Sequence, residues 1–430
     1  MMSQAPTPIV MLSQFDWQTW LSMFWFMILL EFPRYTLSAL AIFAASFTKK
    51  PVLTARERAY LEKLNITVVV AGHNEADAMG RCLRSLGEQT RCIDEIIVID
   101  DGSTDGMREM INKLQREGQI SMALSNQVRS GKPTSCNAGI LLSKGDIIIN
   151  LDADCSYDFD AIEKLIEPFV DPDVGGVTGS IGVRNFGWSA VAAWQSIEYM
   201  VSIALGKRAQ NMLDIVVCVS GAFGAFRRTA LQQVGEMTTG PGEDFELTLR
   251  LRRSGWKIRF AADSWCFTDV PATVTSIMNQ RRRWDRDALR SRFRKFRDAL
   301  YPGRRKFQLL EAAEQIEFLI MNVLTTLVFP VYIGWMFLVF GSAAWTILGF
   351  IALFYLLLDT VGFLIALRVT RRYDARMVWT IAPYLLTFNL YNGVFMRLVR
   401  LYAYYEEWVH RRSYQDSYSP SRITKQAMTY

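Results

Sequence analysis

The sequence predicts an α/β domain with a mainly parallel sheet, flanked by transmembrane α-helices. Three observations predict this architecture. Short apolar runs rich in β-branched residues alternate with helical patterns between residues 60 and 270, as in a parallel sheet covered by helices on both faces. Acidic clusters directly follow three of these runs. Apolar segments of about twenty residues or more stand near both ends of the chain, and such segments are long enough to cross about 30 Å of hydrocarbon.

The composition agrees with a membrane-associated protein. Of the 430 residues, 50% are hydrophobic and 21% are charged, which excludes a disordered chain, a collagen-like chain and a disulfide scaffold. Residues 281–306 carry twelve Lys and Arg against three Asp, which is a local charge of +9, whereas the whole chain has a net charge of +6. A basic cluster beside an apolar segment is typical of contact with anionic lipid headgroups. We therefore expect a lipid bilayer and no nucleic acid as a partner, with Arg281 and Arg282 as headgroup anchors.

The cysteines indicate a reducing compartment. All six lie in the polar middle of the chain without a CxxC pair, and the protein has only two histidines, so no zinc cluster is expected. We expect reduced, mostly buried thiols in a cytoplasmic domain. The residues are Cys82, Cys92, Cys136, Cys155, Cys218 and Cys266.

The first apolar segment, residues 17–47, is predicted to span the membrane, because it is too long for a signal peptide and has no cleavage site. Residues 1–16 contain no Lys or Arg, whereas four basic residues follow the segment within residues 48–59. The positive-inside rule thus predicts an extracytoplasmic N-terminal tail and a cytoplasmic middle. Glu31 and Arg34 interrupt the segment, either as a pair within one helix or as a polar contact to another membrane helix.

Three further apolar segments cover residues 317–340, 344–367 and 378–398. Three full crossings would place the C-terminal tail outside, yet the chain around and after the last segment is basic, which predicts the inside. Either this last segment, which contains Pro383, is re-entrant or interfacial, or the positive-inside rule is overridden.

Polar residues follow the predicted strands at residues 66–71, 95–99 and 146–151. Ligands of parallel sheets bind beyond the carboxyl ends of the strands, so these residues are expected to form one site. Asp152 and Asp154 are spaced i,i+2 and therefore point to the same side. Such a pair suits a divalent cation that keeps waters and bridges phosphates. The second cluster, DDGSTD, could also be an Asx turn that caps a helix.

Six motifs occur in a fixed order along the chain: VVVAGHNEA, VIDDGSTD, SGKPTSCNAGI, NLDADC, GEDFELTLRLRRSGW and QRRRW. Over roughly residues 60–300 the chain thereby resembles an inverting family 2 glycosyltransferase. It is most similar to the membrane-embedded processive branch, which includes the chitin, hyaluronan, cellulose and poly-N-acetylglucosamine synthases and the nodulation chitooligosaccharide synthase. The QxxRW element, here Gln280, Arg283 and Trp284, is the most discriminating.

The resemblance implies a GT-A-type nucleotide-sugar domain and fixes the expected organisation of the chain. A membrane helix and a linker precede the cytoplasmic glycosyltransferase domain, and basic interfacial helices, further membrane helices and a polar tail follow it. The expected boundaries are 1–16, 17–47, 48–59, 60–280, 281–316, 317–405 and 406–430.

On the donor side, Asp154 is the expected ligand of Mg²⁺ or Mn²⁺, and Asp152 is directed at the ribose or at the same metal. The resemblance assigns Asp101 to the uracil and Glu75 to the nucleoside pocket. Lys132, in the SGKP loop, is expected to meet the diphosphate, with a solvated loop lysine as the alternative.

On the acceptor side, Asp244 is the expected general base, because the family pattern places the acid second in the Glu243-Asp244 pair. It stands just ahead of a helix predicted over residues 245–253, whose N-terminus favours an anion. The family typically has Thr where this chain has Gly242, which leaves the local hydrogen bonding open. The stereochemistry implied is inversion, so that an α-linked donor gives a β-linkage.

The remaining predicted acceptor residues would hold the growing glycan. Trp284 would stack on its terminal sugar, Gln280 would bind sugar hydroxyls, and Arg283 would offer a rigid fork for diphosphate oxygens. The resemblance places Ser220 and Gly221 under the acceptor path.

The leading hypothesis is a processive synthase that polymerises a β-linked polysaccharide from a UDP-sugar and passes it across the membrane. The alternative is a non-processive enzyme that adds one sugar to a lipid or lipid-linked acceptor. A degenerate scaffold without activity is disfavoured because all the expected acids are present. The expected partners are the UDP-sugar donor, the growing glycan acceptor and the bilayer, and an accessory membrane or export subunit is left open.

Overall fold

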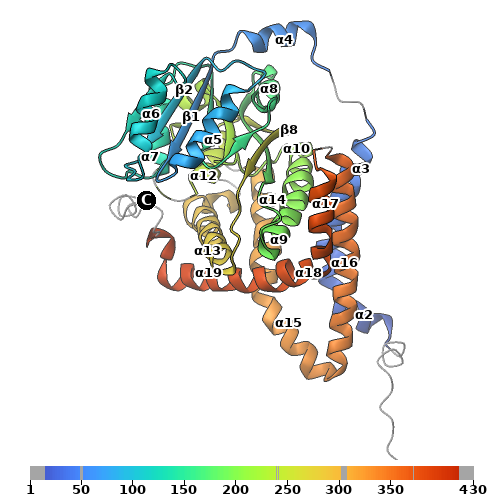
Figure 1. The fold of residues 1–430 in the computed structure, drawn as a ribbon. Coiled ribbons are helices and arrows are strands. Elements are labelled where there is room, and N and C mark those ends of the chain that lie inside the picture. Colours follow the sequence, from blue (N-terminus) through green and yellow to red (C-terminus); the bar gives the residue numbers. More distant parts are fainter. Residues whose placement is uncertain are drawn as a thin grey trace, which may run out of the picture.

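The protein combines a sheet-based domain with long helices that extend away from it (Figure 1). The computed structural model describes residues 15–48, 52–238, 240, 242–301, 308–370 and 372–415. Most of the predicted N-terminal tail and most of the polar C-terminal tail therefore lie outside the described residues, as do residues 302–307 of the basic run.

One eight-stranded sheet forms the centre of the domain, in the order β3-β2-β1-β4-β7-β6-β8-β5. Strands β3, β2, β1 and β4 run parallel, β7 is antiparallel to both of its neighbours, and β6 and β8 are parallel again. The predicted, mainly parallel α/β architecture is thus confirmed. The bounds are β1 Ile66–Gly72, β2 Glu95–Asp100, β3 Met122–Ser125, β4 Ile147–Asp152, β5 Ser156–Tyr157, β6 Val174–Val183, β7 Phe223–Arg227 and β8 Lys257–Thr268.

Strand β1 explains why the central strands read as continuous apolar runs. Val68 and Val70 belong to the hydrophobic cluster on one face of the sheet, whereas Val69 and Ala71 belong to the cluster on the other face. Every residue of this strand is buried, as expected where helices cover both faces.

Helices connect the strands and cover the sheet (Figure 1). Helix α7 starts after Gly131, whose φ of +86° favours glycine, and has a proline in its first turn. The bounds are α4 Ala55–Glu62, α5 Ala76–Gly87, α6 Met107–Arg116, α7 Lys132–Leu142, α8 Ala161–Ile166, η2 Glu167–Val170, α9 Ala190–Tyr199, η3 Met200–Lys207, α10 Arg208–Met212, α11 Arg228–Val234 and α12 Glu243–Arg253.

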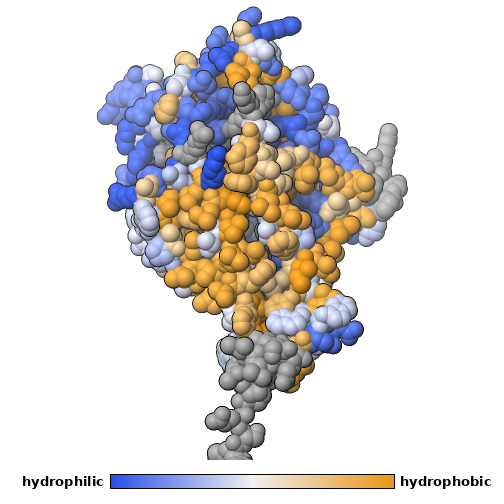
Figure 2. Space-filling view, turned by 90° about the vertical axis from the view of Figure 1, so that its right-hand side faces the viewer, coloured by the Kyte–Doolittle hydropathy of each residue, from blue (hydrophilic) through white to orange (hydrophobic). Residues whose placement is uncertain are grey.

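Within the described residues, three helices are long and apolar enough to cross a membrane: Met27–Ala45, Leu309–Phe340 and Ala343–Val369. They correspond to the first three apolar segments of the sequence. Hydrophobic residues cover much of the surface in this part of the molecule, whereas the sheet domain above it is largely hydrophilic (Figure 2). An apolar surface of this extent requires lipid or another apolar partner, which indicates an integral membrane protein. The segments comprise α2 Trp17–Phe26, η1 Met27–Leu37, α3 Ser38–Ala45, α14 Leu309–Phe318, η6 Leu319–Leu324, α15 Thr325–Phe340 and α16 Ala343–Val369.

The last apolar segment is broken into several pieces; the first runs beside α16, and the later ones lie across the long helices (Figure 1). A 3₁₀ turn that contains Pro383 separates its first two helices, because proline cannot donate a backbone hydrogen bond to a continuing helix. This course supports the interfacial alternative over a further crossing. The pieces are α17 Ala375–Ile381, η7 Ala382–Tyr384, α18 Leu385–Asn389, η8 Leu390–Phe395 and α19 Met396–His410, followed by η9 Arg412–Gln415.

Glu31 and Arg34 contact other helices. The buried Glu31 accepts a hydrogen bond from Arg397 Nη2 at 2.7 Å and another from the Tyr355 hydroxyl. Arg34 instead forms an ion pair with Glu317 at 2.6 Å. The alternative in which Glu31 and Arg34 pair with each other within one helix is therefore wrong. The observed arrangement is the other alternative, a polar contact to another membrane helix.

Helix α13, Val274–Arg290, crosses the boundary that the sequence predicted at residue 280. Arg281 contacts Glu198 of α9 at 2.8 Å, and Arg282 contacts Glu406 of α19 at 2.5 Å. These arginines join helices through ion pairs, which differs from the headgroup contact that the sequence predicted. The shorter helices η4 Ser291–Lys295 and η5 Arg297–Leu300 follow α13.

The cysteines are free thiols, as expected. Four of the six are buried, Cys218 is half-buried and Cys92 is exposed; the buried ones are Cys82, Cys136, Cys155 and Cys266.

Candidate active site

The carboxyl ends of β1, β2 and β4 meet at one edge of the sheet. The strand register pairs Ala71 of β1 with Ile99 of β2 on one side and with Asp152 of β4 on the other. The residues that follow these strands are therefore neighbours in space, although they are up to about eighty positions apart in the sequence.

Three carboxylates lie close together at this edge. Burial raises the pKa of Glu75 to about 7, and the charges of Asp154 and Asp152 contribute to this rise. Burial and the charge of Asp152 also raise the pKa of Asp154. The edge therefore carries an excess of negative charge that a cation would relieve.

The donor set fits Mg²⁺ or Mn²⁺. Among the described residues, no group of three or more His, Cys, Asp or Glu side chains could hold a metal ion by itself. A cation at Asp152 and Asp154 would thus complete its shell with water and phosphate oxygens, which is the usual coordination of Mg²⁺ in nucleotide sites.

Lys132 lies between Asp152 and a second acidic pair, Glu243 and Asp244. It is the first residue of α7, and its ammonium forms an ion pair with Asp152. Burial opposes its charge, but Asp152 and Glu243 outweigh burial and raise the pKa of Lys132 above its ordinary value. Its Nζ is also 3.2 Å from the position that a Cβ at Gly221 would occupy. Lys132 therefore stands at the start of a helix and in an ion pair, and not in an open loop without a partner.

Asp244 lies within the first turn of α12, because this helix begins two residues earlier than the sequence predicted. Its Oδ1 accepts a hydrogen bond from the Phe245 amide at 2.7 Å, and its Oδ2 accepts one from the Gly221 amide at 3.2 Å. The bond from Gly221 joins the predicted base to the turn that was expected beneath the acceptor.

Gly242 has a geometric reason to differ from the threonine that is typical of the family. Its φ is +74°, in the left-handed region. A Cβ at this position would lie 3.3 Å from the Cβ of Asp287 on α13. Glycine therefore allows α13 to pack closely against the start of α12.

Glu243, the first member of the acidic pair, has a raised pKa. Burial and then the charge of Asp244 raise the pKa of Glu243 to about 7. Near neutral pH its carboxyl group is thus partly protonated, which reduces its repulsion of the neighbouring carboxylate.

The Ser220-Gly221 turn is supported from below by residues that the sequence reasoning missed. Lys207 Nζ lies 3.4 Å from Ser220 Oγ and 3.1 Å from Thr178 Oγ1, and Thr178 Oγ1 also accepts the Ser220 amide hydrogen at 3.2 Å. The sequence signal that could have indicated Lys207 is that it forms, with the next residue, a Lys-Arg pair at the end of an apolar run.

Asp101 fixes the loop that leads into α7. Its buried carboxylate accepts hydrogen bonds from the amides of Ser130 and Gly131, both at 2.7 Å, and from the side chains of Asn126 and Ser135, both at 2.9 Å. Oδ2 accepts only the Gly131 amide among these, so it retains capacity for the predicted contact with the uracil.

The QxxRW residues lie on α13, which passes the start of α12 at Asp287. Trp284 is 40% exposed, and the Arg281 guanidinium lies 4.6 Å from its ring centroid. Gln280 Oε1 is buried without a hydrogen-bond partner among the described residues. The structure thus places Gln280, Arg283 and Trp284 on the helix beside the predicted base.

Two further residues hold the backbone of the DAD motif. Arg184 donates to the carbonyl of Asp154 at 2.7 Å, and the Tyr157 hydroxyl donates to the carbonyl of Asp152 at 3.2 Å. The sequence offered one hint, because Arg184 directly follows the long buried strand β6.

The sheet and its strand order have the GT-A fold that is typical of glycosyltransferases. A solved mannosyltransferase from Pyrobaculum calidifontis, in complex with GDP-Man and Mn²⁺, superposes with a TM-score of 0.56 at 20% identity. The match covers 84% of this chain and 96% of that chain. At this identity the likeness concerns the fold.

The sequence itself is similar to one glycosyltransferase family. Residues 67–235 match the model of glycosyl transferase family 2, in agreement with the motifs. The poly-beta-1,6-N-acetyl-D-glucosamine synthase of Staphylococcus aureus strain MSSA476 is 34% identical over 241 residues, 56% of this chain and 57% of that protein. The Staphylococcus epidermidis synthase is 31% identical over 221 residues, 51% and 53% of the two chains. The chain thus matches little more than half the length of these curated relatives.

Proposed function

We propose that this protein is an inverting, processive glycosyltransferase that polymerises a β-linked polysaccharide from a UDP-sugar and passes it across the membrane. The observation that carries the proposal is that two acidic pairs flank Lys132. One pair is Asp152 and Asp154, and the other is Glu243 and Asp244. A donor diphosphate and an acceptor hydroxyl need these two environments side by side.

On the donor side, Asp154 and Asp152 would hold the divalent cation, and Glu75 and Asp101 would line the nucleoside pocket. The cation would take up charge on the diphosphate as it leaves. Lys132 would bind the same diphosphate, since its ammonium already lies between the two acidic groups.

On the acceptor side, Asp244 would accept the proton of the attacking hydroxyl. The Gly221 amide and the N-terminus of α12 hold its carboxylate in place. A single base at this position fits inversion. Trp284 and Gln280 would bind the end of the glycan, with Ser220 and Gly221 beneath it, and Arg283 would bind diphosphate oxygens.

The relatives favour an N-acetylglucosamine polymer. Their names specify a β-1,6-linked poly-N-acetyl-D-glucosamine, so UDP-N-acetylglucosamine is the first donor to test. The basic residues after the first membrane helix favour a cytoplasmic catalytic domain, and an accessory membrane or export subunit would complete the export path.

The test is a donor panel with the purified full-length protein in lipid, in which UDP release and product mass are measured together. We expect UDP release with UDP-N-acetylglucosamine and a ladder or high-mass product. A single lipid-soluble adduct would instead favour the non-processive alternative. The matched control is Asp244→Asn, which keeps the shape of the side chain and removes the base. UDP release by this variant equal to wild type would contradict the proposal.

A further inference from the structure

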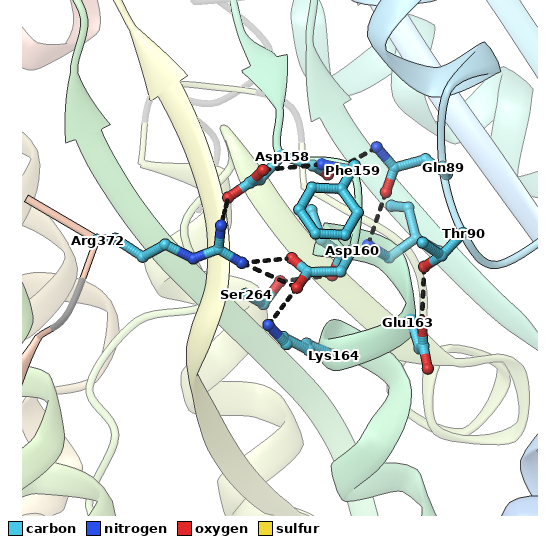
Figure 3. A network of polar contacts seen from close by, with 11 residues as sticks. Gln89, Thr90, Asp158, Phe159, Asp160, Glu163, Lys164, Ser264 and Arg372 are labelled. Carbon is cyan, nitrogen blue, oxygen red and sulfur yellow. Dashed lines mark hydrogen bonds and ion pairs between the residues drawn. The ribbon is translucent and has the colours of Figure 1, made fainter.

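The turn between α16 and α17 docks on the sheet domain through Arg372 (Figure 3). Its Nη1 lies 2.5 Å from Asp158 Oδ2, and its Nη2 donates to both oxygens of Asp160 at 2.9 and 2.8 Å. The neighbouring Tyr373 packs edge-on against Trp265 of β8, with 5.5 Å between ring centroids. The end of a predicted membrane span is thus joined directly to the sheet domain.

The geometry of this contact requires an arginine. One planar guanidinium engages two carboxylates at once, and charge-assisted bonds of this kind are stronger than neutral ones. A lysine ammonium has no such fork. The three side chains are largely withdrawn from solvent, with 31%, 18% and 13% of Arg372, Asp158 and Asp160 exposed. Lys164 also pairs with Asp160, so two cations balance two anions.

The contact lies a few residues beyond the DAD motif. Strand β5, Ser156–Tyr157, is the only element between Asp154 and Asp158, and the Asp158 amide donates to the Trp265 carbonyl at 3.1 Å. The Tyr157 hydroxyl and Arg184 hold the carbonyls of Asp152 and Asp154. A displacement of Asp158 would therefore be transmitted through a short, hydrogen-bonded segment to the two acids.

We propose that Arg372 is a positioning residue that ties the membrane helices to the cation-binding loop. By holding Asp158 and Asp160, it fixes the segment that presents Asp152 and Asp154 to the donor. The inference rests on the proposed function, because it assumes that these two acids bind the cation.

The test measures Mn²⁺ binding directly, by the electron paramagnetic resonance signal of free Mn²⁺, with the full-length protein and UDP but without turnover. We expect Arg372→Gln to weaken Mn²⁺ binding about tenfold, the lower end of the range for residues that support metal ligands. Arg372→Lys should lie between this variant and wild type. The matched control is Arg376→Gln, since Arg376 is exposed on the same segment and forms no ion pair with a described residue; it should bind Mn²⁺ like wild type.

A double variant separates positioning from general stability. Arg372→Gln combined with Asp160→Asn should weaken Mn²⁺ binding by less than the product of the two single effects, because each change removes the Arg372–Asp160 contact. Unchanged Mn²⁺ affinity in Arg372→Gln, with or without a lower Tm, would overturn the inference. If Arg372→Gln does not fold, the same criterion applies to Arg372→Lys. Absence of Mn²⁺ binding in wild type would overturn the metal assignment in the proposed function, and this inference with it.

Discussion

Glu243 and Asp244 are adjacent in the sequence and yet have different surroundings. Asp244 accepts hydrogen bonds from the Phe245 and Gly221 amides, which suits a carboxylate that must stay in one orientation. Glu243 is buried beside the charge of Asp244, and burial and this charge raise its pKa to about 7. The two residues should therefore respond differently to the loss of their charge.

Asp244→Asn should lower turnover by roughly 10² to 10⁴, because the amide cannot accept the hydroxyl proton. UDP should bind about as tightly as in wild type, since Asp244 lies on the acceptor side. Glu243→Gln should be milder. Initial rates of UDP release and calorimetric titration with UDP measure the two effects. If the two variants exchange these outcomes, the base is Glu243.

The raised pKa of Glu243 also predicts a pH-dependent stability. Between the ordinary glutamate pKa of about 4.3 and the folded value of about 7, the folded state binds a proton that the unfolded state has released. Raising the pH through this window therefore destabilises the wild type. Glu243→Gln cannot ionise, so its Tm relative to wild type should be higher at pH 8 than at pH 5. An equal Tm difference at both pH values would contradict the assigned burial.

Asp154 allows a separate test of the cation. EDTA should abolish turnover and added Mg²⁺ or Mn²⁺ should restore it, because an uncompensated diphosphate is a poor leaving group. Asp154→Ala should lose activity by a factor of about 10³ or more. UDP release in a coupled assay measures both effects. Full activity in EDTA would exclude the metal site.

At the scale of the element, ion pairs join α13 to α9 of the sheet domain and to α19. Arg281 and Arg282 pair with Glu198 and Glu406 on two different helices, so the helix that carries QxxRW is held from both sides. Trp284 remains partly exposed on it. An aromatic ring that is fixed in this way can offer a flat face to a sugar.

Trp284→Ala should shorten the polymer more than it slows UDP release. Its stacking is a contact of about 0.5–1.5 kcal/mol beyond area burial for aromatic pairs, so acceptor dissociation should rise by about tenfold at most. Trp284→Phe should give intermediate lengths. Product size at matched turnover is the measurement, after insertion and folding of each variant are confirmed. Equal lengths for wild type and Trp284→Ala would favour the non-processive alternative.

The elements that could be predicted from sequence are those whose signal is local. The apolar β-branched runs predicted β1, β2 and β4 to within about a residue at each end, and the carboxyl ends of these strands located one edge of the candidate site. Arg372 could not be found in this way, because it is 212 positions away from Asp160. The left-handed Gly242 and the support of Ser220 by Lys207 likewise depend on packing between distant segments.

At the scale of the whole molecule, the crosswise course of α18 and α19 reconciles the charge pattern with the number of membrane helices. The described residues contain three helices that are long and apolar enough to cross a membrane. With the N-terminus outside, three crossings return the chain to the cytoplasmic side, where the basic residues after the last crossing are expected. Glu406 and Glu407 then face α13 and η4 on the same side, as their ion pairs with Arg282 and Arg294 require.

This topology predicts the location of the C-terminus. A fluorescent protein fused after Tyr430 should fluoresce, and alkaline phosphatase fused at the same place should be inactive, because both reporters would remain in the cytoplasm. Phosphatase inserted at the turn between α15 and α16, next to Gly341, should be active and serves as the control. The expected activities follow from three crossings, and a fourth crossing by residues 378–398 would reverse the result at the C-terminus. An active phosphatase after Tyr430 would therefore mean that the last segment spans the membrane and that the positive-inside rule is overridden.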